Sequence, residues 1–294
     1  MHAKVDPEPR QRMIELPGRG GAMAVLDFGP PGRPADIVLS HANGFNGRTY
    51  HSILQPLARD LRILALDLRG HGASALPTVV EGRQGWIEFR DDLLALLAEA
   101  CEAPVVLAGH SMGGTTSLLA AAAEPQRVRA LALFDPVAVP VQAQADAATM
   151  GASPLAQGAL RRRAAFPSRA AAFEAYRGRG GFKTWSDAQL ADYVEAGFAE
   201  TPGGEVTLTC APAWESSNFR THNYDVWKAF FESRCPVRVL RAAEGSTFNV
   251  EGRDADLAAL APRVTVETIP DTTHFLPMER PDLVRGALAA CAAL

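Results

Sequence analysis

The sequence has no long apolar run. No stretch of about 18 apolar residues is free of charged side chains, so no segment is expected to cross a membrane. Residues 1–11 are polar and lack the apolar core of a signal peptide. There is also no excess of positive charge, because the formal net charge is −4, and the one basic cluster, Arg161-Arg162-Arg163, is expected to be a solvated helix face. These absences predict a cytoplasmic protein with no membrane or nucleic-acid partner.

The sequence is also poor in patterns that bind metals or form disulfides. Its four cysteines are far apart, with no Cys-x-x-Cys spacing, and its seven histidines show no His-Glu-x-x-His pattern. We therefore expect reduced, mostly buried thiols, no metal and no other cofactor. The expected partner is a small-molecule substrate, bound by a monomer or a homodimer. The cysteines are Cys101, Cys210, Cys235 and Cys291.

Apolar strand-like runs alternate with helical patterns over most of the chain. Near-continuous apolar strands of this kind are typical of a parallel sheet that helices cover on both faces. The length of 294 residues fits one large α/β domain with an insertion. The expected strands are 22–28, 36–40, 62–67, 104–108, 128–134, 236–241 and 263–269, and the expected helices are 50–59, 85–100, 111–123, 254–260 and 281–290.

One segment, 139–234, breaks this alternation. It contains helical patches without a convincing strand pattern, and it carries three of the four tryptophans. This aromatic content argues against disorder. We predict a core domain made of residues 1–138 and 235–294. The segment 139–234 is then a mostly helical cap over the carboxyl ends of the strands, where sites form in such sheets.

Ser111 is the strongest catalytic candidate. It lies in Gly109-His110-Ser111-Met112-Gly113, between the apolar run 105–108 and the helical stretch 116–123. Strand, Gly-x-Ser-x-Gly and helix in this order are typical of a nucleophile elbow, whose tight turn needs small residues two positions before and after the serine. The strained serine is lifted above the sheet edge, next to the helix N-terminus. The pattern therefore predicts Ser111 as a nucleophile.

A serine nucleophile needs a base, and the base needs a carboxylate behind it. His274 is the predicted base, because it lies on the loop after the last predicted strand, at the same sheet edge as the serine. Two carboxylates are the main candidates for the acid. Asp135, at the end of the strand before the cap, is favoured over Glu244, which follows the first strand after the cap. Less favoured acids are Glu251 and Asp254.

The developing oxyanion needs two aligned N–H donors. Met112, the residue after the nucleophile, is expected to supply one, and the loop 40–47 the other, with Asn43 as the predicted donor. The aromatic content of the cap predicts a small to medium, fairly apolar substrate. The candidate substrate contacts are His110, Phe45, Trp214 and His222.

These segments together resemble the α/β-hydrolase superfamily, in its capped branch of lactonases, esterases and meta-cleavage-product hydrolases. The resemblance covers roughly residues 20–134 and 235–290. The matching motifs, in chain order, are His41-Ala42-Asn43-Gly44, the Asp-Leu-Arg-Gly-His-Gly-Ala-Ser stretch 67–74, the Gly-His-Ser-Met-Gly-Gly stretch 109–114, the strand 236–240, and Thr273-His274-Phe275.

The resemblance implies an α/β-hydrolase fold, a mostly parallel, doubly wound sheet of about eight strands with a helical cap inserted after strand 6. The sequence departs from the family at one important place. The usual Gly-x-x-Asp after the seventh strand is absent, since the aligned positions 242–245 end in Gly245. Some members take the acid from the end of the sixth strand, which favours Asp135 and the chain order Ser111, Asp135, His274.

We therefore expect a serine hydrolase that forms an acyl-enzyme from a carboxylic ester, lactone or thioester. Epoxide hydrolase and dehalogenase chemistry is disfavoured, because those relatives carry aspartate at the Ser111 position. Carbon–carbon bond hydrolysis and perhydrolysis use the same triad and stay open as alternatives. A non-catalytic ligand-binding protein of this fold is a further alternative, supported by the missing aspartate.

Overall fold

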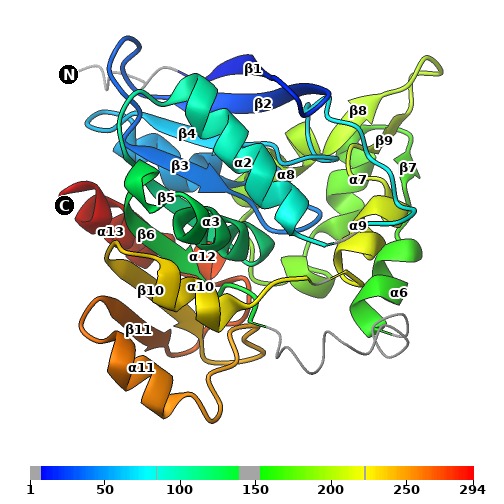
Figure 1. Ribbon diagram of the computed structural model, residues 1–294. Helices are drawn as coiled ribbons and strands as arrows, with labels where there is room; N and C mark the ends of the chain where they lie inside the picture. The colour runs from blue at the N-terminus through cyan, green and yellow to red at the C-terminus, as the bar shows by residue number, and fades with distance from the viewer. Residues whose placement is uncertain (1–7, 84, 139–152, 222) are drawn as a thin grey trace, which may run out of the picture.

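An eight-stranded sheet forms the centre of the protein, in the order β1-β2-β4-β3-β5-β6-β10-β11 (Figure 1). The computed structural model describes residues 8–83, 85–138, 153–221 and 223–294. Neighbouring strands from β4 to β11 are parallel, whereas β2 is antiparallel to both β1 and β4. The strands are β1 (Arg10–Leu16), β2 (Gly21–Phe28), β3 (Ile37–Ser40), β4 (Ile63–Leu66), β5 (Val105–His110), β6 (Val128–Phe134), β10 (Val237–Ala242) and β11 (Val264–Ile269).

Helices cover both faces of this sheet (Figure 1). One face packs against α2, α3, α10 and α11, and the other packs against α1, α12 and α13. Short 3-10 turns, η1 and η2, flank α1. The bounds are η1 (Gly47–Tyr50), α1 (His51–Leu54), η2 (Gln55–Leu57), α2 (Ile87–Ala100), α3 (Met112–Ala123), α10 (Val226–Glu232), α11 (Asp254–Leu260), α12 (Leu276–Glu279) and α13 (Pro281–Ala292).

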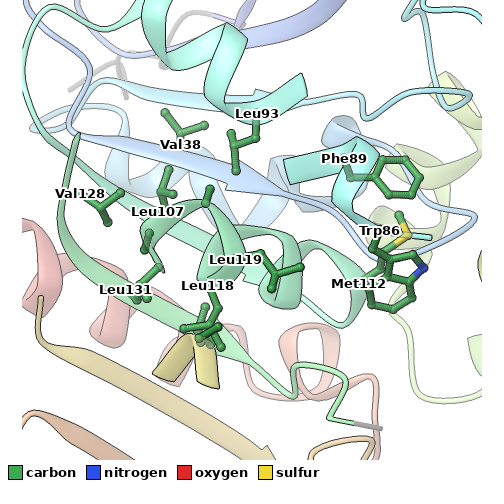
Figure 2. Packing of buried hydrophobic residues seen from close by; sticks show 14 of the residues in the cluster. Val38, Trp86, Phe89, Leu93, Leu107, Met112, Leu118, Leu119, Val128 and Leu131 are labelled. Atoms are coloured by element: carbon green, nitrogen blue, oxygen red, sulfur yellow. The ribbon is translucent and has the colours of Figure 1, made fainter. Parts of the chain in front are cut away.

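The apolar strands fill two hydrophobic clusters, one on each face. Successive side chains of a strand point to opposite faces, so a continuous apolar run feeds both clusters. In β5, Val105 and Leu107 pack in the cluster beneath α2 and α3, whereas Val106 and Ala108 pack in the cluster beneath α13. Figure 2 shows the first cluster, with side chains of α2 and α3 meeting those of the strands. The predicted fold class is confirmed.

The seven predicted strands lie within two residues of their expected bounds, but β1 is missing from the prediction. Residues 10–15 alternate between half-buried and exposed positions at the edge of the sheet, and the first two residues of β1 lie in the segment 1–11 that was expected to be a polar terminus. In the structure, Arg10 and Arg12 of β1 each lie 3.1 Å from the buried Asp27 carboxylate of β2. These ion pairs, which no local pattern indicates, add to the antiparallel pairing of β1 with β2 along the whole strand.

The described part of the segment between β6 and β10 forms helices and a separate small sheet (Figure 1). The antiparallel strands of this sheet, in the order β7-β9-β8, have two or three residues each, too few for a recognisable pattern. Helix α10 lies within the predicted cap range but packs on α3 in the core layer. The elements are α6 (Pro154–Leu160), β7 (Ala165–Phe166), α7 (Arg169–Tyr176), η4 (Gly180–Phe182), α8 (Asp187–Gly197), β8 (Phe198–Glu200), β9 (Val206–Leu208) and α9 (Pro212–Asn218).

Replacing Asp27 should destabilise the edge of the sheet. Its buried carboxylate also accepts two hydrogen bonds from Arg62, at 3.0 and 2.9 Å, so Asp27→Ala leaves several cations without their partner. We expect a loss of about 2–4 kcal/mol in the free energy of unfolding, measured by urea titration. The exposed Asp60→Ala is the control and should change stability little. Equal stability of the two variants would contradict this account.

Candidate active site

Ser111 lies in the turn between β5 and α3, with φ 55° and ψ −121°. This left-handed conformation is strained for a residue with a side chain. The flanking glycines permit it: a Cβ on Gly109 would lie 2.3 Å from the Gly113 backbone, and a Cβ on Gly113 would lie 2.2 Å from the Ser40 carbonyl oxygen. The turn is therefore possible only without side chains at these two positions.

A continuous chain of hydrogen bonds joins Ser111, His274 and Asp135. The Ser111 Oγ lies 3.0 Å from His274 Nε2, and the His274 Nδ1 lies 2.7 Å from Asp135 Oδ2. His274 comes from the loop after β11, and Asp135 from the end of β6. The structure thus brings together three of the predicted residues from three distant parts of the chain.

Asp135 is built to stay ionised. Burial acts to raise the pKa of its carboxyl, but bonds from His274, Ser246 and the Ala242 N–H hold that pKa below its usual value. The donor distances are 2.5 Å from the Ser246 hydroxyl and 2.9 Å from the Thr247 N–H. The loop after β10 therefore supplies hydrogen-bond donors to Asp135. The alternative acids Glu244, Glu251 and Asp254 are all exposed.

The predicted oxyanion loop runs beside the start of α3. The Cβ position of Gly113 lies 2.5 Å from the His41 carbonyl oxygen as well as close to Ser40. Among the described residues, neither the Asn43 N–H nor the Met112 N–H has a hydrogen-bond acceptor. Both predicted donors are therefore free to bind an external oxygen atom.

Residues 37–287 match the sequence profile of the alpha/beta hydrolase family. The chain belongs to this family. Among solved structures, E-2-(acetamidomethylene)succinate hydrolase aligns over 97% of this chain and 100% of its own, with a TM-score of 0.76 and 21% identity. A hypothetical protein of Pseudomonas aeruginosa PAO1 aligns over 98% and 99%, with a TM-score of 0.71 and 28% identity. The first of these likenesses shows the fold alone.

Curated relatives match over shorter stretches. Lipase LipV of Mycobacterium tuberculosis is 38% identical over 114 residues, which are 38% of this chain and 41% of that protein. Monoglyceride lipase of Rattus norvegicus is 37% identical over 114 residues, 37% of each chain. This hydrolase-family chain thus spans less than half the length of these relatives.

Two buried histidines join the predicted oxyanion loop of this family member, residues 40–47, to the segment that follows β4. The Gly44 N–H donates to His71 Nε2 at 3.1 Å, and the Leu68 N–H donates to His41 Nε2 at 2.9 Å. Burial lowers the pKa of His71 to about 4 and that of His41 well below its ordinary value. Both rings are therefore neutral near pH 7, which leaves Nε2 free to accept these bonds.

His110 differs from its predicted role as a substrate contact. Its side chain is fully buried, with Nδ1 2.9 Å from the Tyr50 hydroxyl and Nε2 2.7 Å from the His274 carbonyl oxygen. Burial and the neighbouring His274 lower the pKa of His110 to about 3. His110 therefore braces the main chain of the candidate base and has no face for a substrate.

Trp214 is likewise a packing residue, and the structure does not support its predicted substrate contact. Its side chain is buried, its Nε1 donates to the Arg69 carbonyl oxygen at 3.0 Å, and its ring packs against Phe89 and Arg83. His222, the fourth predicted substrate contact, lies outside the described residues.

Phe45 is the predicted contact that stays partly exposed, and it belongs to an aromatic cluster that the sequence analysis did not assemble. Its ring lies 5.3 Å from Trp185, 6.3 Å from Phe275 and 6.1 Å from His110, centroid to centroid. The Phe275 ring lies 5.8 Å from that of His274. Apolar surface therefore adjoins the candidate base from both the core and the inserted segment.

The basic cluster 161–163 is solvated only in part, because Arg161 and Arg163 are exposed whereas Arg162 points inward. Its guanidinium lies 2.6 Å from Glu215 Oε2 and 2.6 Å from the Tyr193 hydroxyl. Burial acts to lower the pKa of Arg162, but Tyr193 and Glu215 hold it above its usual range, so the side chain stays charged. A Cβ on Gly44 would lie 2.6 Å from Glu215 Oε1, which places this ion pair against the oxyanion loop.

The described residues contain no group of three or more side chains able to hold a metal ion. No helix in the described ranges is long and apolar enough to span a bilayer.

The buried histidines should make the protein lose stability in mild acid. The pKa values of His41, His71 and His110 lie below the ordinary value of 6.5, so the unfolded chain binds more protons below that pH. Asp67 opposes them with one proton, because burial raises its folded-state pKa from 3.8 to about 6. The net difference near pH 5 is about two protons, a slope of up to about 2.7 kcal/mol per pH unit.

Urea titrations at several values between pH 7 and pH 4.5 measure this slope. His71→Asn keeps an acceptor near Gly44 but removes one titrating group, so its slope should be smaller by about 1.4 kcal/mol per pH unit. A wild-type free energy of unfolding that is constant over this range would overturn the assignment of neutral histidines.

Proposed function

We propose that the protein is a serine hydrolase that cleaves a carboxylic ester, lactone or thioester through an acyl-enzyme. The observation that carries this proposal is the hydrogen-bond chain from Ser111 through His274 to Asp135, with distances of 3.0 and 2.7 Å. A hydroxyl in a strained turn, an imidazole within reach and a buried carboxylate behind it are the parts that acyl transfer requires.

In the proposed mechanism, Ser111 Oγ attacks the substrate carbonyl and His274 Nε2 takes the hydroxyl proton. The ionised Asp135 holds the imidazole in the correct tautomer and stabilises the imidazolium. The N–H groups of Asn43 and Met112 receive the oxyanion, and His274 then protonates the leaving group. A water molecule, deprotonated by His274, attacks the acyl-enzyme and releases the acid and Ser111.

The aromatic cluster supports a small to medium, fairly apolar substrate. Phe45 and Phe275 are both partly exposed beside the candidate base, and Trp185 of the cap packs against them. Such surface favours the apolar part of an ester over a charged one. The names of two relatives, a lipase and a monoglyceride lipase, agree with ester chemistry.

Replacing Ser111 tests the nucleophile. We expect wild type to hydrolyse at least one p-nitrophenyl ester in a series of acyl lengths and to react with a fluorophosphonate probe. Ser111→Ala should lose the label and at least about 10⁴-fold in kcat. Ser168→Ala, at an exposed serine, is the matched control and should keep both activities.

Equal turnover of wild type and Ser111→Ala would sink the proposal. A wild type that is inert in every ester assay and unlabelled would favour a ligand-binding protein instead. Labelling without ester turnover would direct the search to carbon–carbon bond hydrolysis or perhydrolysis, which use the same nucleophile.

The acid is tested by comparing Asp135 with Glu244. Asp135→Asn should lower kcat by about 10⁴-fold, because the amide reverses the hydrogen bond that orients His274. Glu244→Gln should stay within about twofold of wild type, since that side chain is exposed. Steady-state kinetics on the best ester measures both, and a large loss in Glu244→Gln alone would show that the acid is misassigned.

A further inference from the structure

The cap holds the side chain of the predicted oxyanion donor at both ends. Asn43 Nδ2 donates to the Glu215 carbonyl oxygen at 3.0 Å, and Asn43 Oδ1 accepts from Asn218 Nδ2 at 2.7 Å. Both partners belong to α9 of the inserted segment, whereas Asn43 belongs to the core loop between β3 and η1. The Asn43 backbone N–H, the proposed donor to the oxyanion, therefore sits on a residue whose side chain is bound to the cap.

Asn218 is itself fixed in one orientation. It is fully buried, its Oδ1 accepts from the Arg83 guanidinium, and its carbonyl oxygen accepts from Trp86 Nε1 at 3.0 Å. Arg83 also donates to the Ser217 hydroxyl at 2.6 Å. Because the Arg83 cation requires the oxygen of the Asn218 amide, the NH₂ group must face Asn43.

The core also restrains the loop at this point, because the Ala42 carbonyl oxygen, which shares a peptide group with the Asn43 N–H, accepts from the Phe45 N–H at 3.1 Å and lies 2.7 Å from His41 Nδ1. On the core side, His71 Nε2 accepts a hydrogen bond from the Gly44 N–H at 3.1 Å. On the side of α9, Glu215 packs so closely that a Cβ on Gly44 would lie 2.6 Å from its Oε1. The Asn43 N–H thus belongs to a loop that the core holds through its main chain, whereas the hydrogen bonds described for the Asn43 side chain both go to α9. A buried amide pair is well suited to this task, since each unmade bond would leave an unsatisfied polar group.

We propose that Asn218 is a positioning residue that holds the Asn43 N–H in line for the oxyanion, so that the oxyanion hole is complete only while α9 is docked on the core. This inference rests on the proposed acyl-transfer function. Moving α9 away would break both Asn43 bonds and remove Glu215 from Gly44 together. Asn218 does not contact the reacting atoms in this account; it acts through the loop.

Asn218→Ala tests the proposal through the transition state. A donor displaced by about 1 Å can cost about 10²-fold, so we expect kcat to fall by about 10- to 10²-fold, with KM within about twofold of wild type. Affinity for an arylboronic acid, which forms a tetrahedral adduct on Ser111, should fall by a similar factor. A merely structural loss would lower the amount of folded protein. It would leave kcat per folded active site, KM and the affinity for the boronic acid as in wild type.

A double-mutant cycle with Asn43→Ala tests the route. If Asn218 acts only through the Asn43 side chain, Asn218→Ala should cost little further in the Asn43→Ala background, so the two losses are not additive. Thr221→Ala is the matched control: its hydroxyl donates to the Ser217 carbonyl oxygen at 2.8 Å at the same end of α9 without touching the loop. Its kcat should stay within about twofold of wild type.

The outcomes separate this inference from the proposed function. An active, labelled wild type with unchanged kcat in a folded Asn218→Ala variant overturns the positioning role alone, as do fully additive losses in the cycle. Thermal melting of each variant shows whether it is folded. Should Asn218→Ala fail to fold, Asn218→Asp, which keeps the acceptor for Arg83 but removes the donor to Asn43, replaces it with the same expected loss.

Discussion

The close approach of α3 to the ends of β3 and β5 is the constraint on which the site depends. A Cβ on Gly113 would lie 2.2 Å from the Ser40 carbonyl oxygen, so this contact exists only because the position is glycine. It brings the nucleophile turn and the loop after β3 to one edge of the sheet. Ser111 is forced into its left-handed conformation there, within reach of a histidine from the last strand loop. This packing contact therefore places Ser111 where His274 can reach it.

The buried titratable groups of the site differ in charge: Asp135 is ionised, whereas His71 and His110 are neutral. Asp135 keeps its charge because donors from His274 and the loop after β10 outweigh the cost of burial. The rings of His71 and His110 stay neutral because burial disfavours their charged forms and no carboxylate among the described residues forms an ion pair with them. In the proposed acyl transfer, a positive charge on His274 would therefore face the Asp135 anion and no buried cation among these histidines.

The inserted segment contributes more than a cover. Its Trp185 packs against Phe45 and Phe275 beside the candidate base, and its α9 forms hydrogen bonds with Asn43 of the predicted oxyanion loop. The ion pair between Arg162 and Glu215 adds to the contact between α9 and this loop, because the Glu215 carboxylate packs against Gly44. The inserted segment and the core are thus joined at Asn43, the predicted donor to the oxyanion. Helix α9 supplies both the groups that bind the Asn43 side chain and the Glu215 carboxylate of this ion pair.

The sequence by itself determined seven of the eight strands of the α/β architecture and the elbow around Ser111, because apolar runs and glycine spacing act between residues adjacent in the chain. It also pointed to His274 and favoured Asp135, although their roles stay predictions. Only the tertiary structure decided which carboxylate stands 2.7 Å from His274, across 139 positions of sequence. It also showed that His110 and Trp214, predicted to contact the substrate, and Arg162, predicted to be solvated, are packed and hydrogen-bonded. Such contacts arise between residues far apart in the chain, where no local pattern reports them.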